Sequence, residues 1–287
     1  MKHETTAYKV FKYVNLLILA LIVFVTVFPF LNVIAQSFSS KAAIDAGQVS
    51  ILPKGFNTDT YKYLMSDKMF WINYKNTLIY TVVGTAVSIF LTTTLAYALS
   101  KKHVPGIKIF VGLAVFTMYF AGGLIPNYLL IRQLGWLNTI WAIIIPSALS
   151  IYNMIIMKSF FEGIPEALEE AATIDGANTY KIFWSIILPL SKPIIATMLL
   201  FYAVSGWNAW FDAFLYIDKK ELFPVTVYLR NIIKGQADQT AGAASDAPTI
   251  SANIKAVTMF LTVLPILCVY PFVQKHFVTG IMLGSVK

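Results

Sequence analysis

Long apolar runs recur along this 287-residue chain, and polar stretches of unequal length separate them. The first run, residues 13–35, contains 23 residues and no charged side chain. A helix that crosses a bilayer needs about 20 such residues, whereas the apolar core of a secretory signal has only about 7–15. We therefore predict that this run is a transmembrane helix that the mature protein keeps.

Five further runs have the same character, so six membrane spans are predicted in all. Residues 76–99, 139–157 and 256–273 each predict one span, and a fifth run ends around Trp207. The remaining run begins near residue 109 and is interrupted by glycines and a proline at 122–126. Either its helix kinks there, or it stops and a short interfacial helix continues toward residue 135.

Composition supports a membrane protein of the all-α class. Apolar residues make up 57% of the chain, charged residues only 13%, and the mean hydropathy is +0.69. Charged residues make up about a quarter of an ordinary soluble domain. A soluble fold of this size has too few polar groups here to cover its surface. The predicted fold is thus a polytopic bundle of six transmembrane helices.

The net charge of +8 does not indicate nucleic-acid binding, because the 22 lysines and arginines are scattered and form no basic stripe. The basic residues in the short polar segments predict how the chain is oriented in the membrane. Three lysines lie in the N-terminal tail and three in the loop 100–108, against Arg132 alone in the next connection. Basic residues favour the cytoplasmic side, so both termini are predicted to be cytoplasmic.

The six spans lack the groups that ion coupling and catalysis require. Charged side chains such as Lys192 and Asp212 fall at or beyond the span ends, so proton or sodium coupling has no site at membrane depth. The chain also has no G-x-x-x-x-G-K-[ST] phosphate loop, no G-x-S-x-G elbow and no clustered histidines. We expect a non-catalytic chain without its own metal or cofactor.

Residues 158–185 form the least membrane-like stretch, with five acidic residues. Pro165 followed by glutamates suits the positive start of a helix. Asp175 and Gly176 then end that helix, and Asn178 or Thr179 caps a second one. Two short helices with an acidic side and an alanine-rich side favour a protrusion that docks another protein. The alternative is an amphipathic loop that only connects spans.

This stretch resembles the E-A-A-x-x-D-G-A signature of ABC importer permeases, with every fixed position present in residues 170–177. Other segments, from residues 52–56 to 270–272, are similar to the carbohydrate-uptake, MalG-like branch, and most of all to its LplC/YtcP-type permeases. The resemblance implies a type I importer fold in a prokaryotic cell membrane. It divides the chain into 1–71, a permease domain 72–273 with the coupling loop 158–185, and a cytoplasmic tail 274–287.

The resemblance also implies partners. Such permeases pair with a homologous second permease, sit on two ATPase subunits that bind ATP and Mg, and receive sugar from an extracellular solute-binding lipoprotein. The helix before Gly176 would be the coupling helix, which lies in a cleft of the ATPase. The residues that would make this contact are Glu170, Ala171, Ala172, Asp175, Gly176 and Ala177.

A sugar path through the membrane needs hydrogen-bonding side chains and flat aromatic faces within an apolar wall. The residues that fit are Asn153, Tyr202, Trp207, Asn208 and Trp210, of which the last three form a cluster with Asp212. Each has a structural alternative, because tryptophan anchors membrane interfaces and polar groups bond helices together. In the family, the partner permease can provide most of the sugar contacts.

Three functions remain in competition. The first is the permease subunit of an ATP-driven carbohydrate importer, with oligosaccharides as the expected substrate. The second is a type I importer permease for a non-sugar solute, and the third is a stand-alone facilitator. The complete acidic loop disfavours the facilitator, because a self-sufficient channel has no use for an ATPase docking element.

Overall fold

The computed structural model describes residues 6–240 and 253–282, and within these ranges every regular element is a helix. The predicted all-α class is therefore confirmed. The chain divides into two compact units. Unit 1 comprises Met1–Lys68 and Leu229–Leu264, and unit 2 comprises Met69–Tyr228 and Pro265–Lys287. Each unit is described by itself.

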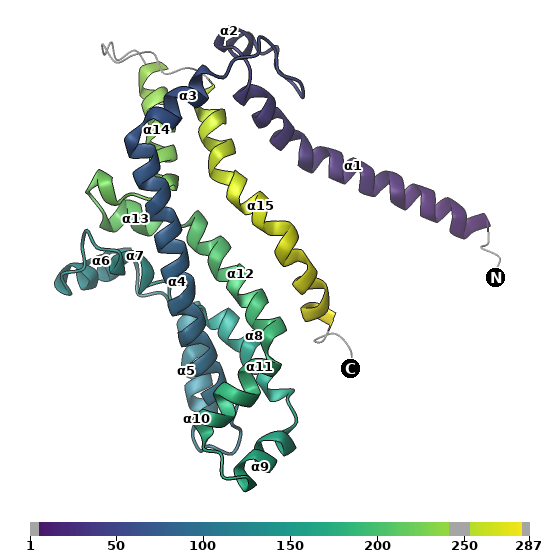
Figure 1. Cartoon of the computed structure of the whole chain (residues 1–287), viewed down its shortest axis with the longest axis vertical. Coiled ribbons are helices and arrows are strands. Elements are labelled where there is room, and N and C mark those ends of the chain that lie inside the picture. Colours follow the sequence, from purple (N-terminus) through teal and green to yellow (C-terminus); the bar gives the residue numbers. More distant parts are fainter. Residues whose placement is uncertain (1–5, 241–252, 283–287) are drawn as a thin grey trace. The chain divides into compact units, whose positions relative to one another are not determined.

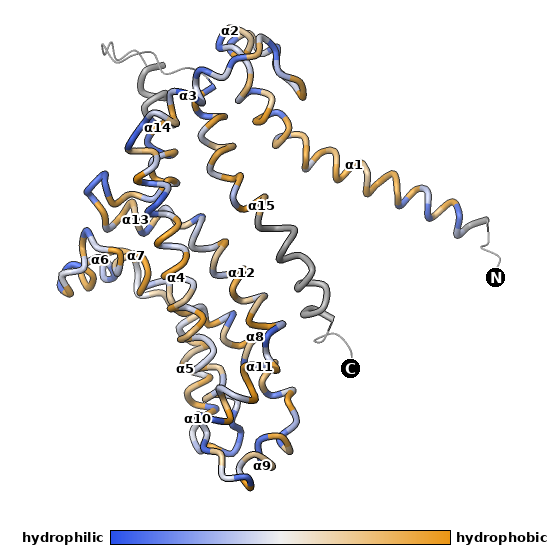
Figure 2. Tube along the Cα trace, viewed as in Figure 1, coloured by the Kyte–Doolittle hydropathy of each residue, from blue (hydrophilic) through white to orange (hydrophobic). Residues whose placement is uncertain are grey.

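Unit 1 contains the predicted first span as α1 (Thr6–Ser37), which is apolar and exposed along most of its length (Figures 1 and 2). Two short helices follow, α2 (Lys41–Asp45) and α3 (Asp59–Ser66). The segment between α1 and α3 is held by Phe38, whose ring stacks on Phe56 and Tyr61 with centroids 5.8 and 5.0 Å apart. This polar connection is thus folded rather than extended.

A buried polar contact ties α3 to the start of α15 within unit 1. The Thr60 hydroxyl donates to Asn253 Oδ1 at 2.5 Å, and Asn253 Nδ2 donates to the Ser39 carbonyl at 3.2 Å. Thr60, Asn253 and Ser39 are all more than nine-tenths buried. Satisfied polar contacts of this kind fix one packing arrangement, because breaking any of them would leave a buried polar group without a partner.

Unit 2 is built around α4 (Lys68–Ser100) and α12 (Lys192–Asn208), with shorter helices packed on them (Figure 1). Between these two lie α5 (Ile107–Tyr119), α6 (Leu124–Gln133), α7 (Trp141–Ile144), α8 (Ile151–Glu162), α9 (Glu166–Ile174), α10 (Thr179–Ile182), the π-helical turn η1 (Phe183–Ile187) and α11 (Leu188–Leu190). After α12 come α13 (Phe211–Tyr216) and the turn η2 (Lys220–Leu222). Helices α14 (Val225–Thr240) and α15 (Ile254–Met282) have residues in both units.

Helix length and hydropathy identify the elements able to cross a membrane. Among the described residues, α1 and α4 qualify as single helices. Two bent pairs also qualify, α5 with α6 at 110° and Thr179–Leu190 with α12 at 81°. The predicted sixth span, 256–273, lies within α15, which continues to Met282. Residues 283–287 of the predicted tail lie outside the described residues.

The third apolar run follows the second of its two interpretations. Helix α5 ends at Tyr119, Gly123 has φ of +96°, and α6 turns away at 110°. A positive φ is readily adopted only by glycine, so this residue permits the sharp corner. The run is therefore a helix that stops and a second short helix that continues to Gln133.

The predicted fourth span, 139–157, is not one helix. Helix α7 contains only four residues, and α8 begins at Ile151 after an irregular stretch. Pro146 lacks an amide hydrogen, and the Ser150 hydroxyl accepts from the Asn153 amide at 3.3 Å as the N-cap of α8. These two residues break the helix, so the run forms two helices instead of the single one that its hydropathy suggests.

The largest apolar core of unit 2 joins helices that are distant in sequence. It brings together Ala96 and Tyr97 of α4, Met154 and Met157 of α8, and Met198 of α12, all at most 7% exposed. Residues of the loop 158–185 also belong to it, namely Phe161, Ala172, Ile182 and Phe183, and Ile187 follows just after the loop. The acidic loop is therefore packed onto the long helices rather than hanging from them.

Candidate functional site

The acidic loop, residues 158–185, folds into the two short helices that the sequence predicts. Pro165 precedes α9, which carries Glu166 and Glu169 in its first turn, where the helix dipole favours negative charge. The Asn178 side chain accepts from the Lys181 amide at 2.9 Å and so caps α10. In Figure 1 these helices lie at the opposite end of α12 from α13. The loop is thus a compact protrusion.

A glycine turn ends α9. Gly176 has φ of +80°, and its amide donates to the Thr173 carbonyl at 3.0 Å. The Ala177 amide donates back to the Ala172 carbonyl at 2.9 Å. This is the pattern with which helices commonly end at a left-handed glycine. The turn makes the tip of the loop a defined shape.

The five acids of the loop fall into two groups. Glu162 pairs with Lys158 at 2.7 Å, and Glu169 pairs with Lys101, which directly follows α4. The other three, Glu166, Glu170 and Asp175, are exposed. The paired carboxylates therefore hold the loop in place, and the exposed ones give its surface a negative charge.

The residues predicted to dock the ATPase do not all face outward. Glu170, Ala171, Asp175 and Gly176 are exposed, and Ala177 is half-buried. Ala172 is only 9% exposed and belongs to the apolar core. Its small side chain lets α9 approach the neighbouring helices closely, and it leaves little surface for another protein. The docking roles of all six stay predictions.

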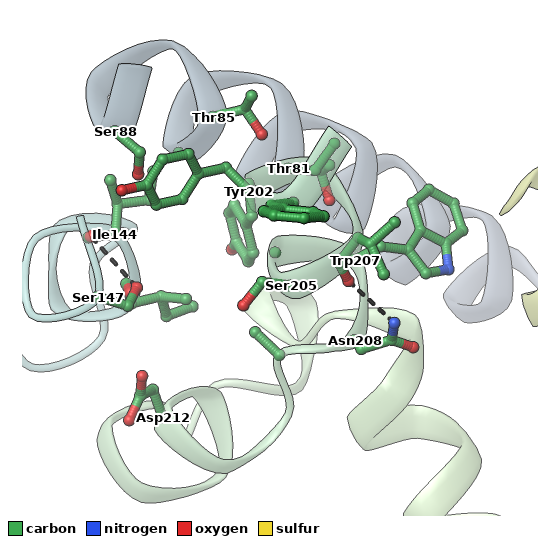
Figure 3. Close-up of a pocket in the computed structure, with 18 of the residues that line it drawn as sticks. Thr81, Thr85, Ser88, Ile144, Ser147, Tyr202, Ser205, Trp207, Asn208 and Asp212 are labelled. Atoms are coloured by element: carbon green, nitrogen blue, oxygen red, sulfur yellow. Dashed lines mark hydrogen bonds between the residues drawn. The ribbon is translucent and has the colours of Figure 1, made fainter. Parts of the chain in front are cut away.

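A cavity of about 1140 Å³ lies in unit 2, between α4, α7, α12 and α13 (Figure 3). All five residues predicted to form a sugar path line it: Asn153, Tyr202, Trp207, Asn208 and Trp210. They come from α8, α12 and the turn before α13. Tertiary packing therefore brings together side chains that lie up to 57 positions apart in the chain.

Hydrogen bonds and ring contacts fix several of these side chains. The Tyr202 hydroxyl lies 2.6 Å from the Thr92 hydroxyl and accepts from the Ser150 amide at 3.2 Å. The Trp207 ring meets Tyr74 edge to face at 5.7 Å. Asn208 Nδ2 donates to the Val204 carbonyl at 2.9 Å, as Figure 3 shows. The aromatic wall is thus held in position before any ligand arrives.

The cavity also has polar residues that the sequence analysis missed. Thr81, Thr85 and Ser88 of α4 line one side, with Ser147 and Ser205 nearby (Figure 3). The spacing of the three α4 hydroxyls, four and then three residues, places them on one face of a helix. That periodicity could have predicted a polar face on this helix. It could not have predicted that this face lies opposite the aromatic residues of α12.

Asp212 is the one charged residue among those that line the cavity. It lies on the α13 side, across from the α4 hydroxyls (Figure 3). Partial burial raises the pKa of its carboxyl above the ordinary value, because a less polar surrounding disfavours the charged form. In the described part of the chain, no three histidine, cysteine or acidic residues gather as a metal site would require.

The chain is similar to known components of membrane transport systems. The family described as "Binding-protein-dependent transport system inner membrane component" matches residues 79–282. The chain is 44% identical to Protein LplC of Bacillus subtilis (strain 168) over 287 residues, 99% of this chain and 97% of that protein. It is 42% identical over 266 residues to the polygalacturonan/rhamnogalacturonan transport system permease protein YtcP of the same organism, covering 92% and 93%.

A solved structure is also similar. A chain in the crystal structure of a bacterial ABC transporter involved in the import of the acidic polysaccharide alginate matches with a TM-score of 0.86. The two chains are 33% identical, and the match covers 96% of this chain and 100% of that one.

Proposed function

Because this chain belongs to the binding-protein-dependent transport system inner membrane component family, we propose that it is the transmembrane permease subunit of an ATP-driven carbohydrate importer. YtcP is a permease for polygalacturonan and rhamnogalacturonan transport, and the similar solved structure is of an alginate importer. Oligosaccharides are therefore the proposed substrate, and this chain would form half of their path through the membrane.

The observation that carries the carbohydrate assignment is the cavity of unit 2. Trp207, Trp210 and Tyr202 offer flat aromatic surfaces, and the threonines and serines around them offer hydroxyl groups. Sugar rings present both apolar faces and many hydroxyls, so a site of this composition suits them. Amino acids and metal ions call instead for several fixed charges, and Asp212 alone is charged here.

The acidic loop supports the proposed coupling. Its exposed face carries Glu170 and the glycine turn, while its buried face is packed into the core with α4, α8 and α12. An ATPase that moves this loop would move the walls of the cavity with it, because the core joins them. The chain has no phosphate loop, so ATP and Mg are proposed to bind separate ATPase subunits.

The remaining partners follow from the same proposal. A homologous second permease would complete the path, and an extracellular solute-binding lipoprotein would deliver the sugar. In this arrangement the chain crosses a prokaryotic cell membrane six times, with both termini in the cytoplasm. The positive short segments support that orientation.

Uptake of labelled oligosaccharides tests the proposal. Cells that make this chain with its partner subunits should accumulate an oligosaccharide, and replacing Trp207, Asn208 and Trp210 together by alanine should reduce that uptake strongly. Glu221→Ala, a change in the turn η2 away from the cavity, is the control. The proposal fails if no carbohydrate is taken up while an amino acid, peptide or metal ion is, and the proposed path fails if the triple variant transports normally.

A further inference from the structure

Three hydroxyl residues of α4 form a row along the cavity. Thr81, Thr85 and Ser88 follow a spacing of four and three residues, so they share one helix face. All three line the cavity and are more than nine-tenths buried. Figure 3 shows them on the side of the cavity that faces Tyr202 and Trp207 of α12.

Two of these hydroxyls have no hydrogen-bond partner. The Oγ1 atoms of Thr81 and Thr85 are buried without one in the described part of the chain. Threonines in helices commonly donate to the carbonyl one turn earlier, and Thr77 and Thr93 of the same helix do so at 3.0 and 2.6 Å. A buried hydroxyl without a partner destabilises the arrangement that contains it.

Helix α12 covers this part of α4 at a glycine. A Cβ atom at Gly206 would lie 3.5 Å from the Cα atom of Thr81, so the two backbones approach closely there. The hydroxyl oxygens of Thr81 and Thr85 are inaccessible in this arrangement. A ligand in the cavity would reach them only if α12 moved away from α4.

We propose that Thr81 and Thr85 are saccharide-binding residues whose hydroxyls become available when α12 withdraws from α4 at Gly206. The inference rests on the proposed function and assigns it a further binding site. Sugar hydroxyls both donate and accept, so they satisfy threonine hydroxyls that the empty cavity leaves unpaired. A saccharide therefore stabilises the separated arrangement over the closed one, which links its binding to the opening of the cavity wall.

Removal of the two hydroxyls at constant shape tests this site. In the assembled transporter, T81V/T85V should raise the KM for uptake of a labelled oligosaccharide by about tenfold, the effect of losing one or two hydrogen bonds. T81S/T85S keeps both hydroxyls and should stay within about twofold of the parent chain. The matched control is Thr93→Val, since the buried Thr93 hydroxyl is already bonded to the Ile89 carbonyl.

The substrates for the uptake measurement are end-labelled oligosaccharides prepared from pectin, xylan and starch. The second measurement is the melting temperature of each variant in detergent. A raised KM without a lowered melting temperature supports the site, because a packing defect would lower both stability and maximal rate. An unchanged KM in T81V/T85V overturns it, as does a KM raised equally by Thr93→Val. Absence of any oligosaccharide uptake by the parent chain contradicts the proposed function instead.

Discussion

Lys101, the residue directly after α4, forms an ion pair with both carboxylate oxygens of Glu169 in α9. The Lys101 Nζ atom also lies 4.1 Å from the centroid of the Tyr97 ring, and the Tyr97 hydroxyl donates to Glu169 Oε2 at 3.4 Å. The two charged side chains are 19% and 25% exposed. This contact joins the acidic loop directly to the long helix that carries the Thr81 face of the cavity.

Breaking this pair should weaken coupling between the loop and α4. We expect Glu169→Gln or Lys101→Met to lower the free energy of unfolding by roughly 1–3 kcal/mol, between the values for exposed and buried pairs. Uptake should fall by more than the loss of folded protein explains. The exchanged double variant, Lys101→Glu with Glu169→Lys, should recover part of the stability and part of the uptake. A double-mutant cycle with no interaction energy would contradict this role.

The tip of the acidic loop should tolerate neither proline nor a reversed charge. Gly176→Pro replaces a residue with φ of +80° by one restricted to about −65°, and it removes the hydrogen bond to the Thr173 carbonyl. Glu170→Lys reverses an exposed charge. We expect both variants to insert into the membrane normally and to lose sugar uptake, as measured by membrane fractionation and transport.

A matched glycine separates local strain from docking. Gly47 has φ of +64° and, like Gly176, open space where a side chain would begin. Alanine at either position should cost about 1 kcal/mol of backbone strain. Only Gly176→Ala should reduce uptake. Equal loss in both variants would mean that strain, and not the loop surface, is responsible.

Asp212 should make stability depend on pH. Burial raises the pKa of this carboxyl above 3.8, so the folded protein holds its proton more tightly than the unfolded chain does. The stability that this proton binding contributes is complete below the unfolded-state pKa and is lost as pH rises through the folded-state pKa. Relative to Asp212→Asn, the parent chain should therefore melt at progressively lower temperature from pH 4 to pH 7. An equal trend relative to Asp218→Asn, a change at an exposed acid, would contradict this role of Asp212.

Side chains of α4 hold the connection after α13. Asn76 Nδ2 donates to the Glu221 and Phe223 carbonyls at 2.7 and 3.1 Å, and the Tyr80 hydroxyl donates to the Leu222 carbonyl at 2.8 Å. Removing the hydroxyl by Tyr80→Phe should cost about 1 kcal/mol. Asn76→Ala should lower the free energy of unfolding by more than Tyr80→Phe does, and it should speed proteolysis within residues 218–224. Unchanged cleavage in Asn76→Ala would show that other contacts hold this segment.

Local patterns in the sequence account for the predictions that hold. Apolar runs long enough for a bilayer predicted α1 and α4, because a long apolar run is a property of residues that are close together in sequence. The two helices of the acidic loop were also predicted correctly. Pro165, Gly176 and Asn178 start or end a helix through effects on the backbone close to them in sequence. The break before α8 was missed because hydropathy does not register the effect of Pro146 on a helix.

By itself, the sequence determined the helical class, the charge-poor spans and the shape of the acidic loop, all of which depend on residues a few positions apart. Only the tertiary structure decided which polar groups meet. The pairs Lys101–Glu169 and Thr92–Tyr202 join residues 68 and 110 positions apart. No local pattern encodes such contacts, because they depend on how whole helices pack. For the same reason, the unpaired hydroxyls of Thr81 and Thr85 became evident only once α12 lay against α4.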